Sequence, residues 1–158
     1  MGSEAVHKYE VGIAWEGNRG TGTSAYTAYD RSFRVAVAGK PDLAGTADPA
    51  FRGDPAVHNP EELLVAAVAS CHMLFYLSLC ARAGIAVLEY SDAAQGTMQE
   101  RAAGGGQFTG ITLRPRVTVA AGTDLETAEA LHVRANELCF IANSCNFPIR
   151  HHSEVRVA

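Results

Sequence analysis

The chain has 158 residues, of which 47% are apolar and 19% charged, and its formal net charge is −4. This composition is typical of a folded globular protein and excludes a disordered tail, in which low hydrophobicity and high net charge occur together. The length suits a single domain, so we expect residues 1–158 to form one. The 13 lysines and arginines are scattered, so we expect no nucleic acid partner.

The N-terminal third predicts β-strands followed by a long loop. Residues 6–15 alternate between polar and apolar side chains, which predicts a half-buried strand whose apolar face carries Tyr9, Val11, Ile13 and Trp15. Beyond a glycine-rich turn, we expect further strands over residues 24–29 and 33–37. Residues 42–58 contain two Asp-Pro pairs and little periodicity, so we expect a long loop there.

A long helix is predicted over residues 60–83. Asn59 can cap its N-terminus and form a capping box with Glu62, Pro60 suits the first helical position, and Gly84 ends the helix. The helix is about as long and as apolar as a membrane span. Because His72 stands near its centre, and ionisable groups are costly in a bilayer, we expect no membrane partner and a helix buried in protein on all sides.

The C-terminal half adds strands and a second helix. Strands are expected over residues 85–96 and 108–119, separated by a Gly104–Gly106 turn, and Pro115 should mark an edge or a bulge because it lacks an N–H group. A helix should begin after Asp124 and run to about Ala142, and an alternating strand should cover residues 149–157. The order of elements predicts the α+β class.

Four cysteines are too few for a disulfide scaffold, and no apolar signal segment precedes the first strand, so we expect a cytoplasmic protein. Cys139, Cys145, His151 and His152 could be read as a metal site, but their spacing does not fit the usual zinc patterns. Adjacent histidines on a strand also point to opposite faces. We therefore expect neither a metal site nor a cofactor.

Two cysteine motifs resemble those of the OsmC/Ohr family of organic hydroperoxide reductases. Residues 59–71 read NPEELLVAAVASC, similar to the family's long buried helix with its reactive cysteine, and residues 138–144 read LCFIANS, similar to the segment around its second cysteine. Trp15-Glu16-Gly17 with Gly20-Thr21-Gly22-Thr23 resembles the family's N-terminal hairpin. The resemblance implies an OsmC-like fold, with antiparallel sheets around a long buried central helix in an intertwined homodimer.

The resemblance also implies a thiol peroxidase acting on organic hydroperoxides. Cys71 would be the peroxidatic thiolate and Cys139 the resolving cysteine, and an external dithiol, with a lipoyl-type dithiol as one candidate, would reduce their disulfide. Glu61 and a hairpin arginine would complete the site. Arg19 matches the family's arginine best and Arg31 is its rival. The sequence departs from the best-known peroxidase branches at His72 and Phe140, which bears on the substrate.

The alternative to an enzyme is a non-catalytic protein that binds an apolar small molecule beside the long helix. A disulfide reductase is a third possibility, but it usually carries a Cys-x-x-Cys motif, which is absent from this sequence.

A homodimer is also expected from helix geometry. Ten residues separate Glu61 from Cys71, which is about 15 Å of rise and about 280° of rotation along one helix. A glutamate side chain cannot span that distance, so a catalytic Glu61 should act on Cys71 of a second subunit.

Overall fold

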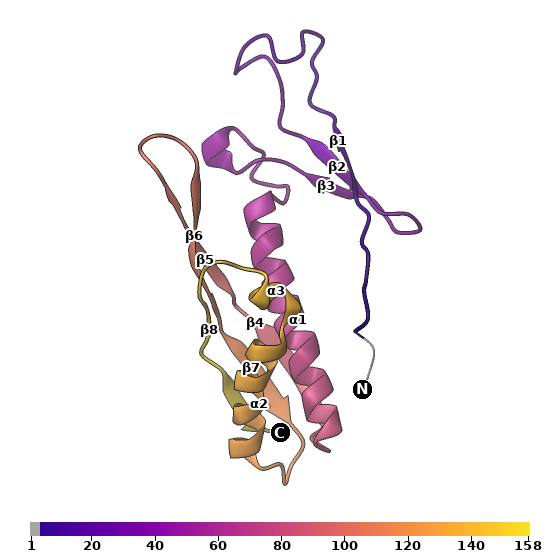
Figure 1. Cartoon of the computed structure of the whole chain (residues 1–158), viewed down its shortest axis with the longest axis vertical. Helices are drawn as coiled ribbons and strands as arrows, with labels where there is room; N and C mark the ends of the chain where they lie inside the picture. The colour runs from indigo at the N-terminus through magenta and orange to yellow at the C-terminus, as the bar shows by residue number, and fades with distance from the viewer. Residues whose placement is uncertain (1–3) are drawn as a thin grey trace. The chain divides into compact units, whose positions relative to one another are not determined.

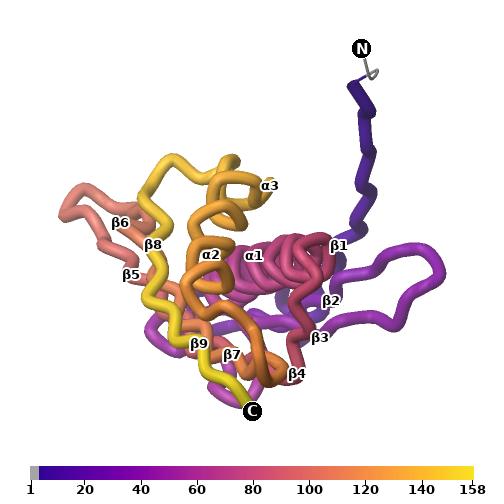
Figure 2. Tube along the Cα trace, turned by 90° about the horizontal axis from the view of Figure 1, so that it is seen from below, coloured from indigo at the N-terminus to yellow at the C-terminus, as the bar shows by residue number. Residues whose placement is uncertain are grey.

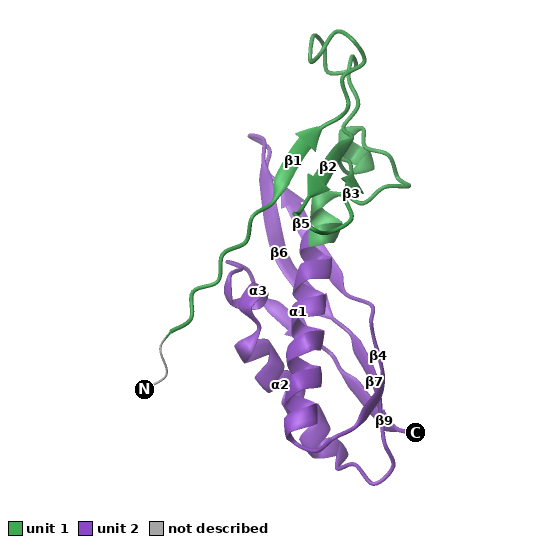
Figure 3. Cartoon of the chain, turned by 90° about the vertical axis from the view of Figure 1, so that its right-hand side faces the viewer, with its two compact units in different colours: residues 1–63 green, residues 64–158 purple. Residues whose placement is uncertain are grey.

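The structure, a computed structural model, describes residues 4–158 (Figure 1). The chain divides into two compact units, Met1–Leu63 (unit 1) and Leu64–Ala158 (unit 2), coloured separately in Figure 3. The described residues form three small sheets and a long helix, together with shorter helices. The predicted α+β class is therefore confirmed. The predicted single domain over residues 1–158 stays a prediction.

Unit 1 holds an antiparallel sheet of order β1-β2-β3, formed by Gly12–Trp15, Phe33–Ala36 and Leu43–Gly45. The strand expected over residues 24–29 is wrong, because this segment forms turns and bends and only Tyr29 makes a bridge, to Asn18. The loop expected over residues 42–58 contains β3 and a short 3₁₀ helix, Pro49–Phe51.

The first strand is shorter and more exposed than its alternation predicts. Only its last four residues pair with β2. Ile13 is 66% exposed and Trp15 is 46% exposed. The prediction of a half-buried strand is therefore wrong for the single chain, because the part of unit 1 that the structure describes leaves this apolar face largely open to solvent.

Unit 2 contains two sheets of three strands each (Figure 1). One has the order β4-β7-β9, formed by Val87–Asp92, Pro115–Val119 and Glu154–Val157; the other has the order β5-β6-β8, formed by Gln95–Glu100, Gly106–Leu113 and Ile149–His151. Each long strand predicted in this half is thus split between two sheets.

The expectation of antiparallel sheets is wrong at two pairings. β8 lies parallel to β6, and β9 lies parallel to β7. Both strands follow the helical segment after β7, and such a crossover connection returns the chain in the direction of the strand that it left.

Pro115 was expected to mark an edge or a bulge, and this expectation is wrong. It is the buried first residue of β7, the central strand of its sheet, and it pairs with Asp92. The first residue of a strand is a position that tolerates the missing N–H group. The neighbouring Arg114 N–H is satisfied by Asp92 Oδ1 at 2.7 Å.

The long helix α1 covers Pro60–Arg82, as predicted to within one residue. Its capping box is present, because Asn59 Oδ1 accepts the Glu62 N–H at 2.8 Å and Glu62 Oε2 accepts the Asn59 N–H at 3.3 Å. The helix ends before Gly84, whose φ of +72° favours glycine.

The second predicted helix is divided at Cys139. α2 covers Leu125–Leu138 and is capped by Asp124, whose side chain accepts the Glu126 N–H. Cys139 is extended, with φ −63° and ψ 114°, and α3 then covers Phe140–Asn143. The expectation of a single helix running to Ala142 is therefore wrong. The break was not predicted because neither proline nor glycine stands there.

In unit 2, α1 and α2 lie side by side on one face of the strands (Figure 2). The buried residues of α1 form one stripe at intervals of four, and each contacts the core: Val68, His72, Tyr76 and Cys80. Val68 packs against Ile111 and Leu113 of β6, whereas Tyr76 packs against Val117 and Val119 of β7. The helix therefore bridges the two sheets.

The other residues of α1 are half-buried or exposed in the single chain. Only 22% of its most apolar 18-residue window is buried, so the expectation of a helix buried on all sides is wrong for one subunit. By length and composition alone α1 could cross a membrane, a property that core helices of soluble proteins share.

Candidate active site

Cys71 and Cys139 meet in unit 2, where α1 contacts the end of α2. Cys71 is half-buried in the middle of α1 and Cys139 is fully buried. Burial, and after it the neighbouring Cys71 side chain, raise the pKa of Cys139 to about 11. Cys139 is therefore a neutral thiol at pH 7 and is in contact with the half-buried sulfur of Cys71.

The break between α2 and α3 positions the Cys139 sulfur. Cys139 is the N-cap of α3, and its Sγ accepts the Ala142 N–H at 3.4 Å. The next residue, Phe140, packs edge-on against Phe75 of α1 with ring centroids 5.0 Å apart. Since Phe75 lies one turn after Cys71, the two cysteines and the two rings form one contact between the helices.

The other two cysteines have ordinary packing roles. Cys80 is fully buried among core residues, and burial raises the pKa of its thiol. Cys145 is half-buried, its thiol donates a hydrogen bond to the Ile141 carbonyl at 3.3 Å, and burial raises its pKa too. All four cysteines are free.

A pair of buried histidines lies beside the two cysteines. His72 Nε2 and His132 Nδ1 are 3.1 Å apart, so one ring donates a hydrogen bond to the other. Their side chains are 1% and 0% exposed, and burial lowers the pKa of His72 to about 4 and that of His132 to about 3. Both rings are therefore neutral at pH 7.

His132 was not among the residues that the sequence predicted for this site. It lies on the buried stripe of α2 with Ala128 and Ala135, seven residues before Cys139. That spacing was the signal available in the sequence, but a histidine at such a position does not reveal its partner. Tyr76 stacks on the His132 ring, with centroids 3.7 Å apart.

The two candidate arginines belong to unit 1, and both guanidinium groups bind main-chain carbonyls of the segment before β2. Arg19 donates to the carbonyls of Thr27 and Ala28 and lies 3.7 Å from Asp30 Oδ1. This guanidinium is half-exposed.

Arg31 is held by two tyrosines. It donates to the carbonyls of Tyr26 and Tyr29 at 2.7 and 2.6 Å, and its guanidinium carbon lies 4.3 and 4.1 Å from the centres of their rings. A guanidinium over aromatic faces is stabilised by the ring quadrupoles. Arg31 is therefore the more tightly held of the two candidates.

Glu61 also belongs to unit 1, in the first turn of α1. Its Oε2 is buried and has no hydrogen-bond partner among the residues from 4 to 158. A buried carboxylate oxygen without a donor is costly, so this atom has an unfilled capacity to accept a hydrogen bond.

Within residues 4–158, histidine, cysteine, aspartate and glutamate side chains form no group of three or more that could hold a metal ion. His151 is half-buried and its neighbour His152 is exposed, as expected for adjacent residues that point to opposite faces.

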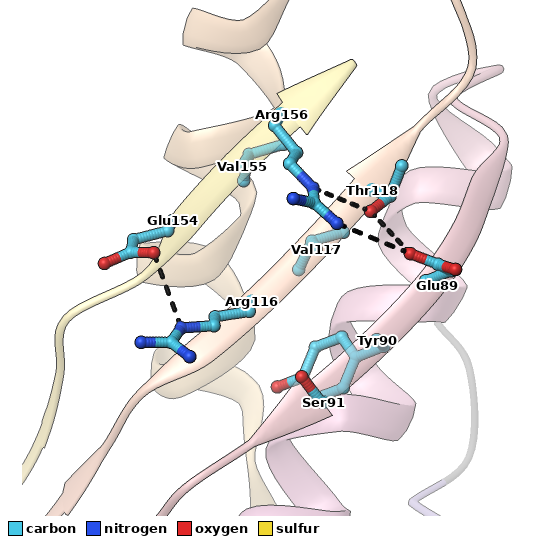
Figure 4. A pocket seen from close by; sticks show the side chains of 9 residues that line it. All are labelled: Glu89, Tyr90, Ser91, Arg116, Val117, Thr118, Glu154, Val155 and Arg156. Atoms are coloured by element: carbon cyan, nitrogen blue, oxygen red, sulfur yellow. Dashed lines mark hydrogen bonds and ion pairs between the residues drawn. The ribbon is translucent and has the colours of Figure 1, made fainter. Parts of the chain in front are cut away.

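A cavity of about 530 Å³ lies over the sheet β4-β7-β9 and is lined by charged pairs (Figure 4). Arg116 lies 3.5 Å from Glu154, and Arg156 lies 3.8 Å from Glu89. Because these charges neutralise one another and no cysteine lines the cavity, we assign it no part in the site.

The fold and the paired cysteines define a class of small α+β proteins with two thiols in contact across a helix pair. The sequence model of the OsmC-like proteins matches residues 53–154. The chain therefore belongs to the OsmC-like family, whose members are small soluble proteins. No curated protein matches the chain at a significant level.

Solved structures share the fold along nearly the whole chain. An OsmC-like protein of unknown function from Vibrio cholerae has a TM-score of 0.82 at 29% identity, covering 94% of this chain and all (100%) of that one. An organic hydroperoxide resistance protein from Legionella pneumophila has a TM-score of 0.69 at 18% identity, with 98% and 100% covered. Another such protein, from Bacillus subtilis, has a TM-score of 0.61 at 18% identity, with 94% and 98% covered.

Proposed function

We propose that the protein is a thiol peroxidase that reduces organic hydroperoxides, with Cys71 as the peroxidatic cysteine and Cys139 as the resolving cysteine. The observation that carries this proposal is the proximity of these two thiols, which come from distant parts of the sequence, since Cys71 contributes to the raised pKa of Cys139. The names of the relatives from Legionella pneumophila and Bacillus subtilis, which refer to organic hydroperoxide resistance, support the substrate class.

The first step uses Cys71 as a thiolate. Its sulfur attacks the O–O bond of the hydroperoxide, the alkoxide leaves and takes a proton to become an alcohol, and Cys71 becomes a sulfenic acid. The neutral Cys139 thiol, which contacts Cys71, is suited to donate a hydrogen bond to the thiolate before this attack.

The second step forms the disulfide. The Cys139 sulfur attacks the Cys71 sulfur, the S–O bond breaks, and the hydroxyl leaves as water with the proton of Cys139. An external dithiol of the lipoyl type then reduces the Cys71–Cys139 disulfide by thiol–disulfide exchange and is itself oxidised. These reactions need a reducing compartment, so we place the protein in the cytoplasm.

Glu61 and an arginine of the N-terminal hairpin are the further residues that we propose for the reaction. A half-buried thiolate needs a nearby guanidinium, and the candidates are Arg19 and Arg31. The buried Oε2 of Glu61, which lacks a partner among residues 4–158, has room for a donor from such a guanidinium or from the hydroperoxide.

A homodimer supplies the groups that one chain cannot bring together. α1 is continuous from Pro60 to Arg82, so Glu61 and Cys71 of one helix stand about 15 Å apart along its axis. The exposed apolar residues Leu74, at 62%, and Ile13, at 66%, need cover, and obligate interfaces bury such surfaces. We therefore propose that Glu61 serves Cys71 of the second subunit.

Turnover of cumene hydroperoxide with dihydrolipoamide as reductant tests the proposed function. Cys71→Ser should abolish turnover, whereas Cys80→Ser, a matched change at a cysteine of the core on the same helix, should retain most of it. A non-catalytic binding protein for an apolar molecule would instead show no turnover in the wild type and unchanged ligand affinity in Cys71→Ser.

A further inference from the structure

The buried histidine pair joins the two helices that carry the cysteines. His72 directly follows Cys71 on α1, and His132 lies two turns before Cys139 on α2. The 3.1 Å contact between Nε2 and Nδ1 joins rings whose planes are nearly parallel, with an interplanar angle of 4°. One polar contact therefore ties α1 to α2 close to the sulfur pair.

The buried residues that flank this pair on the two helices are apolar or aromatic, and such contacts fix the register of two helices less firmly than a buried polar contact does. Val68 and Tyr76 flank His72 on the buried stripe of α1, and Ala128 and Ala135 flank His132 on α2. Apolar side chains tolerate small shifts between helices, whereas a buried polar pair fixes their register. His72 Nδ1 and His132 Nε2 have no hydrogen-bond partner among the described residues. A shift that separated the rings would leave His72 Nε2 and His132 Nδ1 without one as well, and unpaired buried polar atoms are costly.

We propose that the His72–His132 hydrogen bond is a positioning device that holds Cys139 in line for attack on oxidised Cys71, and so sets the rate of disulfide formation. This inference rests on the proposed peroxidase function for its role in turnover. The two histidines are positioning residues, since they act through the helices and do not touch the reacting sulfurs.

The chemistry of the second step explains why position matters. The Cys139 sulfur must approach the Cys71 sulfur in line with the S–O bond that breaks and from the side opposite the oxygen, while the hydroxyl leaves as water. Misplacement of reacting atoms by about 1 Å can lower a rate by about a hundred-fold. The first step, attack on a hydroperoxide that diffuses in, forms no bond to Cys139 and therefore depends much less on where Cys139 lies.

Rapid mixing with cumene hydroperoxide separates the two steps. The sulfenic acid on Cys71 is trapped with dimedone, and the disulfide is followed by quenching and alkylation of free thiols. In His72→Leu/His132→Leu, which removes both polar partners, we expect disulfide formation to slow by at least about ten-fold while sulfenic acid formation stays within about two-fold. The single variant His132→Asn, which keeps a hydrogen-bonding group near the position of Nδ1, should form the disulfide at most of the wild-type rate.

The matched control is His151→Leu. Its ring lies 5.7 Å from that of His72 and 6.1 Å from that of His132, in tilted aromatic contacts, so this change repacks the same cluster but leaves the pair intact. We expect disulfide formation in this variant to stay within about two-fold of wild type. An equal slowing in the control and in the double variant would show that general packing matters and would overturn the proposal.

A peroxide-free measurement separates this proposal from the proposed function. The equilibrium between the two thiols and oxidised glutathione yields the protein disulfide and two reduced glutathiones, and its constant gives the effective concentration of Cys139 at Cys71. We expect this value to fall at least about ten-fold in His132→Leu and to stay within about two-fold in His132→Asn. Equal effective concentrations in the wild type and in His132→Leu would overturn the positioning role, even where the wild type consumes hydroperoxide. If the wild type consumes none, the proposed function fails, and the same comparison still tests the positioning role.

Discussion

His72 Nε2 lies 3.1 Å from His132 Nδ1, in a buried contact that joins α1 to α2 beside the two cysteines. Both rings are neutral because burial lowers their pKa values, to about 4 for His72 and about 3 for His132. A second cause for His132 is the positive charge that His72 or His151 would carry nearby. The pair therefore makes a predictable contribution to the pH dependence of folding.

We expect the free energy of unfolding to fall as the pH falls below about 6.5. Above that pH the histidines are neutral in both the folded and the unfolded chain, so their contribution is fully present. Below it the unfolded chain binds protons that the folded chain excludes, down to the folded pKa values near 4 and 3. Each histidine contributes a slope of at most about 1.4 kcal/mol per pH unit.

Urea denaturation between pH 7 and 5, at one protein concentration, measures this slope. His72→Leu/His132→Leu should show a clearly shallower dependence on pH than the wild type. An unchanged slope in the double variant would contradict the assignment of both histidines as buried and neutral.

The cap of α1 gives a second stability prediction. Asn59→Ala removes the acceptor for the Glu62 N–H and should lower the free energy of unfolding by about 1 kcal/mol. Glu62→Gln is the matched control, since glutamine keeps an acceptor for the Asn59 N–H and fits the same capping box. Chemical denaturation of the three proteins tests this, and an equal loss in both variants would contradict it.

The cap of α1 could be predicted from the sequence because its signals are local. Asn59, Pro60 and Glu62 stand within four residues, and the structure forms the hydrogen bonds that they imply. Asp124 was recognised as the cap of α2 for the same reason. The two cysteine motifs are equally local, and their resemblance to the OsmC/Ohr family predicts that Cys71 and Cys139 act together.

Other features depend on contacts between distant segments and were not predicted. The break at Cys139 occurs in a sequence without a helix breaker, and the next residue, Phe140, contacts Phe75 of a distant helix. The parallel pairing of β8 and β9 depends on the crossover that precedes them. His132 finds its partner 60 residues away, and no pattern within α2 specifies that partner.

The apolar side chains around Cys71 predict a preference for bulky substrates. Leu74 is 62% exposed and Phe140 is 71% exposed, and Phe75 contacts the Phe140 ring. Each CH₂ of a substrate that is buried there contributes up to about 0.8 kcal/mol, or about four-fold in kcat/KM. A series of hydroperoxides from hydrogen peroxide to cumene hydroperoxide tests this, and equal kcat/KM values for these two would contradict an apolar site.

The proposed action of Glu61 across a dimer predicts complementation between inactive variants. Cys71→Ser and Glu61→Ala proteins are mixed in equal amounts under conditions that allow subunit exchange. Half of the dimers are then mixed, and one of the two sites in each of them is intact, so about a quarter of all sites should recover. Glu61→Gln serves as a control for the charge. No recovery after proven exchange, or full activity of a monomer in sedimentation, would contradict this arrangement.

Mapping the disulfide formed by one equivalent of cumene hydroperoxide tests the central claim most directly. The reduced protein is treated with the hydroperoxide, free thiols are alkylated, and the peptides are identified by mass spectrometry. We predict one disulfide, between Cys71 and Cys139, with Cys80 and Cys145 alkylated, and a stable sulfenic acid on Cys71 in the Cys139→Ser variant. Consumption of the hydroperoxide by Cys71→Ser, or a disulfide that does not join Cys71 to Cys139, would contradict the account.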